Sequence, residues 1–305
     1  CWRPVREDDN LAYGTLVHLG LEAWWRAESD GLTAALEAVA GRARDPYQQV
    51  SVEEVLRGYE MCWAADRGLY EVLHVEATFT APLLNPETMA ASRTWQLAGK
   101  VDCIVRERSS GRVLLVEHKS TSENVADGAS PYWAKLAMDG QISHYYVGAE
   151  SLGAQVEGCL YDVVSKPGQR PLKATPPESR KYTKDGRLYA AQRENDETPE
   201  EYRVRVRAAI EADLPGYFQR KPVPRLESDL RDYLGDAWAY AAQIREARLA
   251  GRAPRNPEAC HRFGACPFWD VCANGVKPDE HPETYQRVES AHPELVEQSA
   301  QTRTA

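Results

Sequence analysis

The chain has 305 residues, of which 43% are hydrophobic, so it can bury a sizeable core as one large domain or as one domain with an appendage. Its net charge of −9 argues against broad attraction to nucleic acid, although a local basic groove or bound metal ions could offset that charge. The longest apolar runs are too short to span a bilayer and no signal peptide is visible, so we expect a soluble, cytoplasmic protein with no membrane partner.

Along the first half of the chain, the spacing of apolar residues changes from a helical period to the two-residue period of strands. A helix over 8–29 carries leucines at helical spacing, and a second over 51–69 has Ser51 as a plausible N-cap and Glu54 completing a capping box. Strands follow at 73–83, 94–107 and 111–120, then a helix at 131–151 and a strand at 156–166. Helix, three strands, helix and strand is the element order of an α/β fold with a mixed central sheet flanked by helices.

The second half of the chain is more polar. Residues 166–200 are rich in Pro, Lys, Arg and Glu, which predicts a loop or a lid that becomes ordered on binding. The segment contains candidate phosphate ligands, and a solvated loop explains them equally well: Lys173, Arg180, Lys181, Lys184 and Arg187. Helical patterns resume at 199–213 and 225–249. We therefore expect a core over 1–224, a C-terminal helix and cysteine segment over 225–276 that packs on it, and a charged tail over 277–305.

Two acids and a lysine stand inside an otherwise apolar hairpin, GKVDCIVRERSSGRVLLVEHKS. If the turn is centred on the Ser-Ser pair, Asp102 faces Glu117 and Lys100 faces Lys119. Strand side chains alternate between faces, so Glu117 and Lys119 share one face and His118 projects to the other. The pattern predicts a cluster of charge on one face of the hairpin.

Facing carboxylates repel each other unless a cation lies between them, and hard oxygen ligands suit Mg²⁺ or Mn²⁺. A lysine beside such an ion can orient or help deprotonate a water, and can stabilise charge that builds on a phosphate. The hairpin therefore indicates metal-assisted hydrolysis of a phosphodiester. The structural alternative is an exposed hairpin edge whose charges deter aggregation.

An acid, a hairpin and then Glu-x-Lys resemble the core of the PD-(D/E)xK nuclease superfamily, which has a restriction-endonuclease-like fold. The RecB-like branch of that superfamily carries GTLVH before the core and Gln-x-x-x-Tyr after it, and this chain has GTLVH at 14–18 and QISHY at 141–145. The resemblance covers about residues 10–165, and the motifs occur in the expected order. Val101 stands where many members have a proline before the first acid.

The resemblance implies a set of metal ligands, namely His18, Asp102, Glu117 and the main-chain carbonyl of His118. It also implies that Lys119 acts on the attacking water, and that Gln141 and Tyr145 position the lysine or contact DNA. Glu76 matches an acid often present in this branch, or else it simply pairs with a basic neighbour. The imidazole of His118 points to the opposite face and is better explained as structural.

The seven cysteines are unevenly distributed. Cys260, Cys266 and Cys272 crowd into CHRFGACPFWDVC, Cys1 stands at the other end, and the remaining three read as small buried residues. Thiolates held by turns fit a zinc site or an iron–sulfur cluster. The pattern resembles the iron–sulfur members of the RecB-like branch, including AddB-type nuclease domains and CRISPR-associated adaptation nucleases, which implies a 4Fe–4S cluster on these four cysteines. Zinc, with His261 as a substitute ligand, and free thiols are the alternatives.

A cluster ligated from both ends of the chain would close a very long loop and so act as a structural staple, with no redox role required. Because the sequence begins with Cys1 rather than methionine, we expect the natural protein to have further residues before it.

Taken with its motifs, the resemblance, which extends to phage exonucleases, implies a deoxyribonuclease that uses Mg²⁺ or Mn²⁺. An exonuclease that acts on single-stranded or processed DNA ends in recombination, repair or phage DNA metabolism is the expected form. One alternative is the nuclease subunit of a helicase–nuclease or recombinase complex, whose motor would be another chain because no Walker-type glycine loop is present. A non-catalytic DNA-end or protein-binding module of the same fold is the other alternative, and the intact acids and lysine argue against it.

Overall fold

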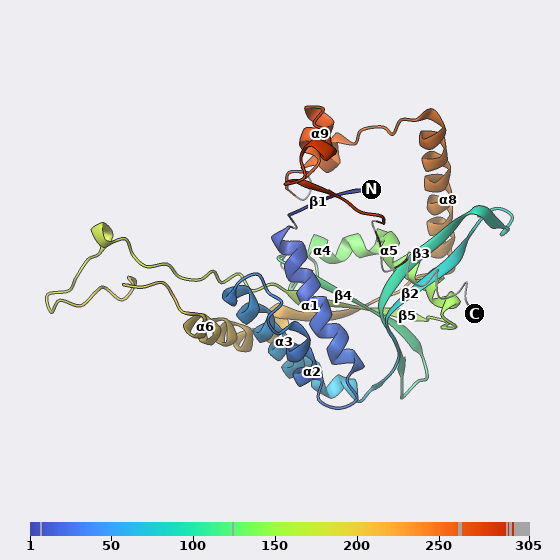
Figure 1. Cartoon of the computed structure of the whole chain (residues 1–305). Helices are drawn as coiled ribbons and strands as arrows, with labels where there is room; N and C mark the ends of the chain where they lie inside the picture. The colour runs from blue at the N-terminus through green and yellow to red at the C-terminus, as the bar shows by residue number, and fades with distance from the viewer. Residues whose placement is uncertain (7, 124, 262–263, 291, 293–294, 296–305) are drawn as a thin grey trace.

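The chain folds around a five-stranded mixed sheet with strand order β2-β3-β4-β5-β6 (Figure 1). The computed structural model describes all residues except 7, 124, 262–263, 291, 293–294 and 296–305. The strands are β2 (Tyr70–Leu84), β3 (Ala91–Glu107), β4 (Val113–Thr121), β5 (Gly158–Ser165) and β6 (Phe218–Val223). Only β4 and β5 are parallel, and the helix between them makes the crossover that a parallel pair requires. The expected mixed sheet is confirmed, whereas the edge strand β6 was not predicted.

Helices cover both faces of this sheet. On one face lie α1 (Asp9–Arg26), α2 (Gly31–Val39), α3 (Pro46–Arg67) and α6 (Pro199–Ala212). On the other lie α4 (Pro131–Ala134) and α5 (Gly140–Ser151), and α8 (Glu227–Ala250) contacts α5 and β2. In β4, Leu114 and Val116 join the first core cluster and Leu115 joins the second. Burial on both faces explains why the central strands are nearly continuous apolar runs.

Helix α3 begins earlier than the sequence suggested. Its N-cap is Asp45, whose side chain accepts hydrogen bonds from the backbone of the first turn, and Pro46 occupies the first helical position. Ser51 and Glu54 are therefore buried residues inside the helix, and the predicted capping box is wrong. The carboxylate of Glu54 instead accepts hydrogen bonds from two arginines of α6.

The single helix expected over 131–151 is broken into α4, a short 3-10 helix η1 (Lys135–Met138) and α5. Asp139 stands at the break and caps α5 by accepting a hydrogen bond from the backbone N–H of Gln141, at 2.8 Å. Helix α5 therefore begins at the point where its first side chains face strand β4. The remaining short elements are α7 (Leu214–Tyr217), η2 (Pro177–Ser179), η3 (Pro257–Cys260), α9 (Trp269–Ala273) and η4 (Pro278–Glu280).

The two ends of the described chain meet in a small second sheet. Strand β1 (Trp2–Pro4) pairs antiparallel with β7 (Tyr285–Arg287), which lies within the segment expected as a charged tail. The buried Tyr285 stacks on Phe268 and donates a hydrogen bond from its hydroxyl to the carbonyl of Pro267, at 3.0 Å. The N-terminal strand, α9 and β7 consequently form one unit beside the main sheet (Figure 1).

Residues 166–198 leave the end of β5 and run far out from the core before the chain returns at α6 (Figure 1). Among the described residues, none of the helices combines the length and apolar character that crossing a membrane requires.

Candidate metal centre

Strands β3 and β4 pair as the hairpin pattern predicted, and then separate. Four residue pairs, from Arg106–Val113 to Cys103–Val116, have the expected register. The ladder ends there, one pair short of the predicted pairing of Asp102 with Glu117. Instead, Oδ2 of Asp102 accepts a hydrogen bond from the backbone N–H of His118, at 2.8 Å. The acid thus lies where the two strands diverge, and its second oxygen remains available.

Lys100 does not face Lys119, as the hairpin register suggested. It pairs with Thr78 of β2, and its ammonium forms an ion pair with Glu76. The reason is that β3 is longer than β4, so its first half pairs with β2 alone.

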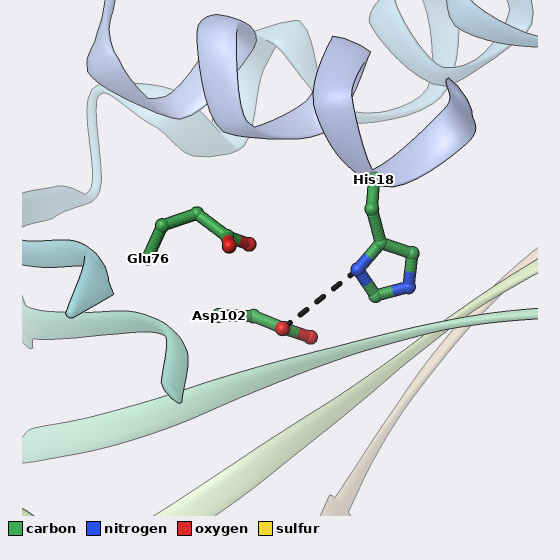
Figure 2. A group of neighbouring side chains, drawn as sticks. All are labelled: His18, Glu76 and Asp102. Carbon is green, nitrogen blue, oxygen red and sulfur yellow. Dashed lines mark ion pairs between the residues drawn. The ribbon is translucent and has the colours of Figure 1, made fainter. Parts of the chain in front are cut away.

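His18, Glu76 and Asp102 converge from three different elements, α1, β2 and β3 (Figure 2). One potential ligand atom of each lies within 4.8 Å of the other two, and Nδ1 of His18 lies 3.7 Å from Oδ1 of Asp102. The surrounding protein lowers the pKa of His18 to about 4, chiefly because burial disfavours the imidazolium. A neutral imidazole and two carboxylates form a donor set that suits a divalent cation such as Mn²⁺ or Mg²⁺.

Glu76 occupies a strained backbone position. Its φ angle is 52°, in the left-handed region that residues other than glycine rarely enter, and it follows an irregularity of β2 between Val72 and His74. Such strain persists where the surrounding structure enforces it, and it is concentrated at functional sites. Burial and the nearby charge of Asp102 also raise the pKa of Glu76, against the opposing effect of Lys100.

Glu117 and Lys119 lie on one face of β4, as predicted. Glu117 is only 2% exposed, its Oε1 lies 2.5 Å from Nζ of Lys119, and its Oε2 has no hydrogen-bond partner among the described residues. Burial and the charge of Asp102 raise the pKa of Glu117 to about 8, although Lys119 acts in the opposite direction. A buried carboxylate oxygen without a partner is costly, and a cation bound next to it would offset that cost.

Lys119 is held from two sides. Besides Glu117, its ammonium donates to Oε1 of Gln141 on α5 at 2.9 Å, and Nε2 of Gln141 donates to the hydroxyl of Tyr145 at 2.8 Å. Burial opposes the charge on Lys119, but the carboxylates of Glu117 and Asp102 outweigh it and raise its pKa. The lysine is therefore a fixed cation, suited to orienting a water or stabilising a phosphate rather than to removing a proton.

The imidazole of His118 lies on the opposite face of β4 from Glu117 and Lys119, and its ring centroid is 6.2 Å from that of His18. Its Nδ1 lies 3.0 Å from Oδ2 of Asp162 under α1 and α3, where Arg220 also contacts Asp162. The backbone N–H of His118 contacts Asp102, and the structural role expected for its side chain stays a prediction.

A cavity of about 620 Å³ opens over these groups, with His18, Glu76, Asp102, Lys119 and Ser120 in its lining. Gly14, the first residue of GTLVH, allows α1 to approach closely, because a Cβ atom there would lie 2.9 Å from Oγ of Ser120. The carboxylates of Glu22, Glu76 and Asp102 all line this cavity.

The four cysteines expected to hold a cluster belong to the unit that joins the chain ends. Cys1 accepts a backbone hydrogen bond from Val288 beside β7, and the backbone N–H of Cys266 donates to Cys260 at 2.9 Å. All are free thiols. Of the three other cysteines, Cys103 and Cys159 are buried as expected, whereas Cys62 is only half-buried, so the expectation was wrong for it. Among the residues that the structure describes, the cysteines form no group with three ligand atoms within 4.8 Å of one another. A preformed site for a single zinc ion, with metal–sulfur bonds of about 2.3 Å, is therefore not present in the described chain.

Comparisons with known proteins give a family for the chain. A family model described as the PD-(D/E)XK nuclease superfamily matches residues 3–273. None of the curated proteins matches the chain. A solved structure titled "Crystal structure of SSO0001" is 11% identical, with coverage of 89% of this chain and 90% of that chain, but its TM-score of 0.31 supports no further argument.

Proposed function

Because the chain belongs to the PD-(D/E)XK nuclease superfamily, we propose that it is a metal-dependent deoxyribonuclease that hydrolyses phosphodiester bonds. The observation that carries the proposal is the convergence of His18, Glu76 and Asp102 beside Lys119 and the unpartnered oxygen of Glu117. These donors suit Mg²⁺ or Mn²⁺, and His18, Glu76, Asp102 and Lys119 line one cavity.

In this proposal, His18 and Asp102 hold the ion, with Glu76 and Glu117 as the further carboxylates and the His118 carbonyl as an additional candidate. When bound, the ion polarises the scissile phosphate and lowers the pKa of a water. Lys119, fixed by Glu117 and Gln141, stabilises negative charge on the phosphate and orients the attacking water. Tyr145 keeps Gln141 in position.

The substrate that we propose is single-stranded DNA or a processed DNA end, cleaved exonucleolytically in recombination, repair or phage DNA metabolism. The net charge of −9 supports a strand threaded into a local site rather than a duplex bound across an open basic face. A nuclease subunit paired with a separate helicase or recombinase chain has the same chemistry and is the second candidate.

The test is a time course on end-labelled single-stranded DNA with Mn²⁺, comparing the intact protein with Lys119→Ala. Lys277→Ala is the matched control, because it removes an exposed lysine that forms an ion pair with Glu280. We expect loss of cleavage in Lys119→Ala and full cleavage in the control, and the product ladder gives the polarity. If the intact protein cuts nothing, or Lys119→Ala cuts equally well, the catalytic assignment is wrong and a DNA-binding module becomes the better explanation.

We further propose that Cys1, Cys260, Cys266 and Cys272 hold a structural 4Fe–4S cluster, with zinc as the less favoured alternative. The pairing of β1 with β7 supports this proposal, because it brings the first cysteine to the unit that carries the other three. A four-iron cluster is larger than a single ion and needs more widely separated thiolates. Anaerobic purification followed by iron, sulfide and zinc analysis decides between them, with Cys266→Ser as the variant and Cys62→Ser as its control. Protein that holds neither metal would leave free thiols as the answer.

A further inference from the structure

The segment between β5 and α6 has a defined conformation and begins at the metal centre. We name residues 166–193 the basic arm; Figure 1 shows it extending away from the core. Its first residue, Lys166, donates a backbone hydrogen bond to Thr121 at the end of β4, at 2.7 Å. The ammonium of Lys166 donates to the side chain of Asn10 at 3.1 Å, and Asn10 lines the cavity that contains Lys119. The base of the arm therefore lies at the rim of the candidate site.

The arm doubles back on itself through its own hydrogen bonds. Near its base, the backbone N–H of Thr175 donates to Arg193 at 2.9 Å, and at its tip Tyr182 and Leu188 form a β-bridge. The tip closes in a tight turn that requires the positive φ of 74° at Gly186. Because the backbone of the tip is already ordered, its side chains are preorganised. Binding a ligand therefore costs less conformational entropy than it would for an unstructured loop.

The charge of the arm is opposite to that of the whole chain. Eight lysines and arginines stand against two acids between residues 166 and 193, in a chain of net charge −9. Near the base, Lys173 is paired with Asp196. At the tip, Lys181, Lys184 and Arg187 are exposed, and none of them forms an ion pair with any residue that the structure describes. These three cations lie at the end farthest along the arm, whereas Arg170, which is also exposed and has no ion pair with a described residue, lies near the base.

Two exposed tyrosines accompany these cations. Tyr182 is 51% exposed and Tyr189 is 52% exposed. Cations that follow a phosphate backbone, together with aromatic rings on which bases can stack, are the combination used by proteins that bind single-stranded nucleic acid. An acidic protein surface would explain the cations but not the paired, exposed rings.

We propose that the basic arm is a second contact for the DNA strand whose end lies at the metal centre. Lys181, Lys184 and Arg187 bind phosphates at its tip, and Tyr182 and Tyr189 stack on bases. The proposal rests on the nuclease function proposed above and assigns the arm to the same substrate. A fully extended chain from the base to the tip spans at most about 60 Å, and at about 3.4 Å per nucleotide a strand of roughly 18 nucleotides is long enough to reach both contacts.

The test is DNA binding by fluorescence anisotropy, with Ca²⁺ in place of Mn²⁺ to prevent cleavage, on labelled single strands of about 6 and about 30 nucleotides. One variant replaces Lys181, Lys184 and Arg187 with alanine, and a second replaces both tyrosines. The matched control removes three exposed arginines from the distant α8 region, Arg245, Arg252 and Arg255. Thermal unfolding of each variant verifies that it remains folded.

We expect the triple variant to bind the long strand at least about tenfold more weakly, and its salt dependence to be shallower by about 2 in log–log slope. The tyrosine variant should lose about tenfold in affinity with its slope unchanged. Cleavage of the short strand in Mn²⁺ should be the same in the arm variants and the intact protein. If both arm variants bind the long strand as the intact protein does, the proposal is overturned and the cations serve another partner, such as an acidic protein. Arm-dependent binding without any Mn²⁺-dependent cleavage would retain the arm and reject the nuclease.

Discussion

The backbone N–H of His118 donates a hydrogen bond to Oδ2 of Asp102, with 2.8 Å between the heavy atoms. This bond joins β3 and β4 at the point where their ladder ends, and it fixes the acid so that Oδ1 faces His18. The same carboxylate therefore has two roles. One oxygen accepts a hydrogen bond that joins the strands where their backbone pairing has ended, and the other oxygen is available to a metal ion.

Asp102→Asn separates these two roles. The amide oxygen can still accept the hydrogen bond from His118, so we expect the fold to be retained. Because the charge is lost, affinity for Mn²⁺ should fall by at least about tenfold and cleavage by at least about a hundredfold. Calorimetric titration with Mn²⁺ and the cleavage assay measure the two effects, with Glu87→Gln in the exposed β2–β3 turn as the control. Unchanged Mn²⁺ affinity would exclude Asp102 as a ligand.

The contacts of Lys119 predict a graded series of activities. Lys119→Ala removes the cation itself and should cost at least about a hundredfold in rate. Gln141→Ala removes one of the two side chains that contact the lysine ammonium, and we expect the rate to fall about tenfold. Tyr145→Phe removes only the hydrogen bond between Tyr145 and Gln141, and we expect the rate to fall a few-fold. The loss should appear in kcat rather than KM, since these side chains position the lysine. A larger loss in Tyr145→Phe than in Gln141→Ala would contradict this order.

The raised pKa of Glu117 predicts how the metal-free protein responds to pH. The folded state holds this proton up to about pH 8, whereas the unfolded chain releases it near the ordinary carboxyl value of 4.5. Between these values the folded state binds more protons, so this group lowers stability as pH rises. Glu117→Gln removes the effect and should raise the melting temperature of metal-free protein at pH 8 by about 2 °C or more, with little change at pH 5.

The same group predicts proton release on metal binding. A cation next to Glu117 favours its ionised form, so Mn²⁺ should bind more tightly as pH rises towards 8. Titrations in two buffers of different ionisation enthalpy measure the number of protons released at pH 7. We expect release in the intact protein and less in Glu117→Gln, and equal release in both would point to a different proton donor.

The sequence allowed the hairpin to be predicted because alternation and register are local properties. The four pairs of β3 with β4 and the shared face of Glu117 and Lys119 follow from a two-residue period and one turn. The divergence at Asp102 could not be predicted, since it depends on β2 pairing with the first half of β3. Glu76 was recognised only as one possible member of the site for the same reason: its left-handed backbone and its contact with α1 arise from tertiary packing.

Other differences between the predicted and the observed elements have similar physical causes. The start of α3 moved because Asp45 and Pro46 form a cap that lies before the first strongly apolar turn. Strand β6 is short and carries Arg220 among its residues, so its pattern did not indicate a strand. Its partner Asp162 is likewise a polar residue in an apolar strand, and only the fold brings the two together.

Arg220 and Asp162 form a buried ion pair, and we expect this pair to stabilise the position of His118 beside the metal centre. Asp162 is fully buried, and it also accepts a hydrogen bond from Tyr59 at 2.6 Å and lies beside His118. Burial alone would raise the pKa of Asp162, but Arg220 and His118 outweigh it and lower the value. Asp162 thus contributes stability above the unfolded carboxyl pKa, near pH 4, and that contribution is lost as pH falls below it.

Arg220→Met should therefore cost about 3–5 kcal/mol in the free energy of unfolding at pH 7, because it leaves a buried carboxylate without its cation. The double variant Arg220→Met/Asp162→Asn should recover most of that loss at pH 7, and its advantage over Arg220→Met should shrink at pH 4, because protonation neutralises the uncompensated carboxylate. Urea unfolding at pH 7 and pH 4 measures both effects. Because His118 contacts Asp162 with its imidazole and Asp102 with its backbone, the single variant should also weaken Mn²⁺ binding. A loss below about 1 kcal/mol would show that this buried pair contributes little to stability, and it would remove the link between the core and the metal centre.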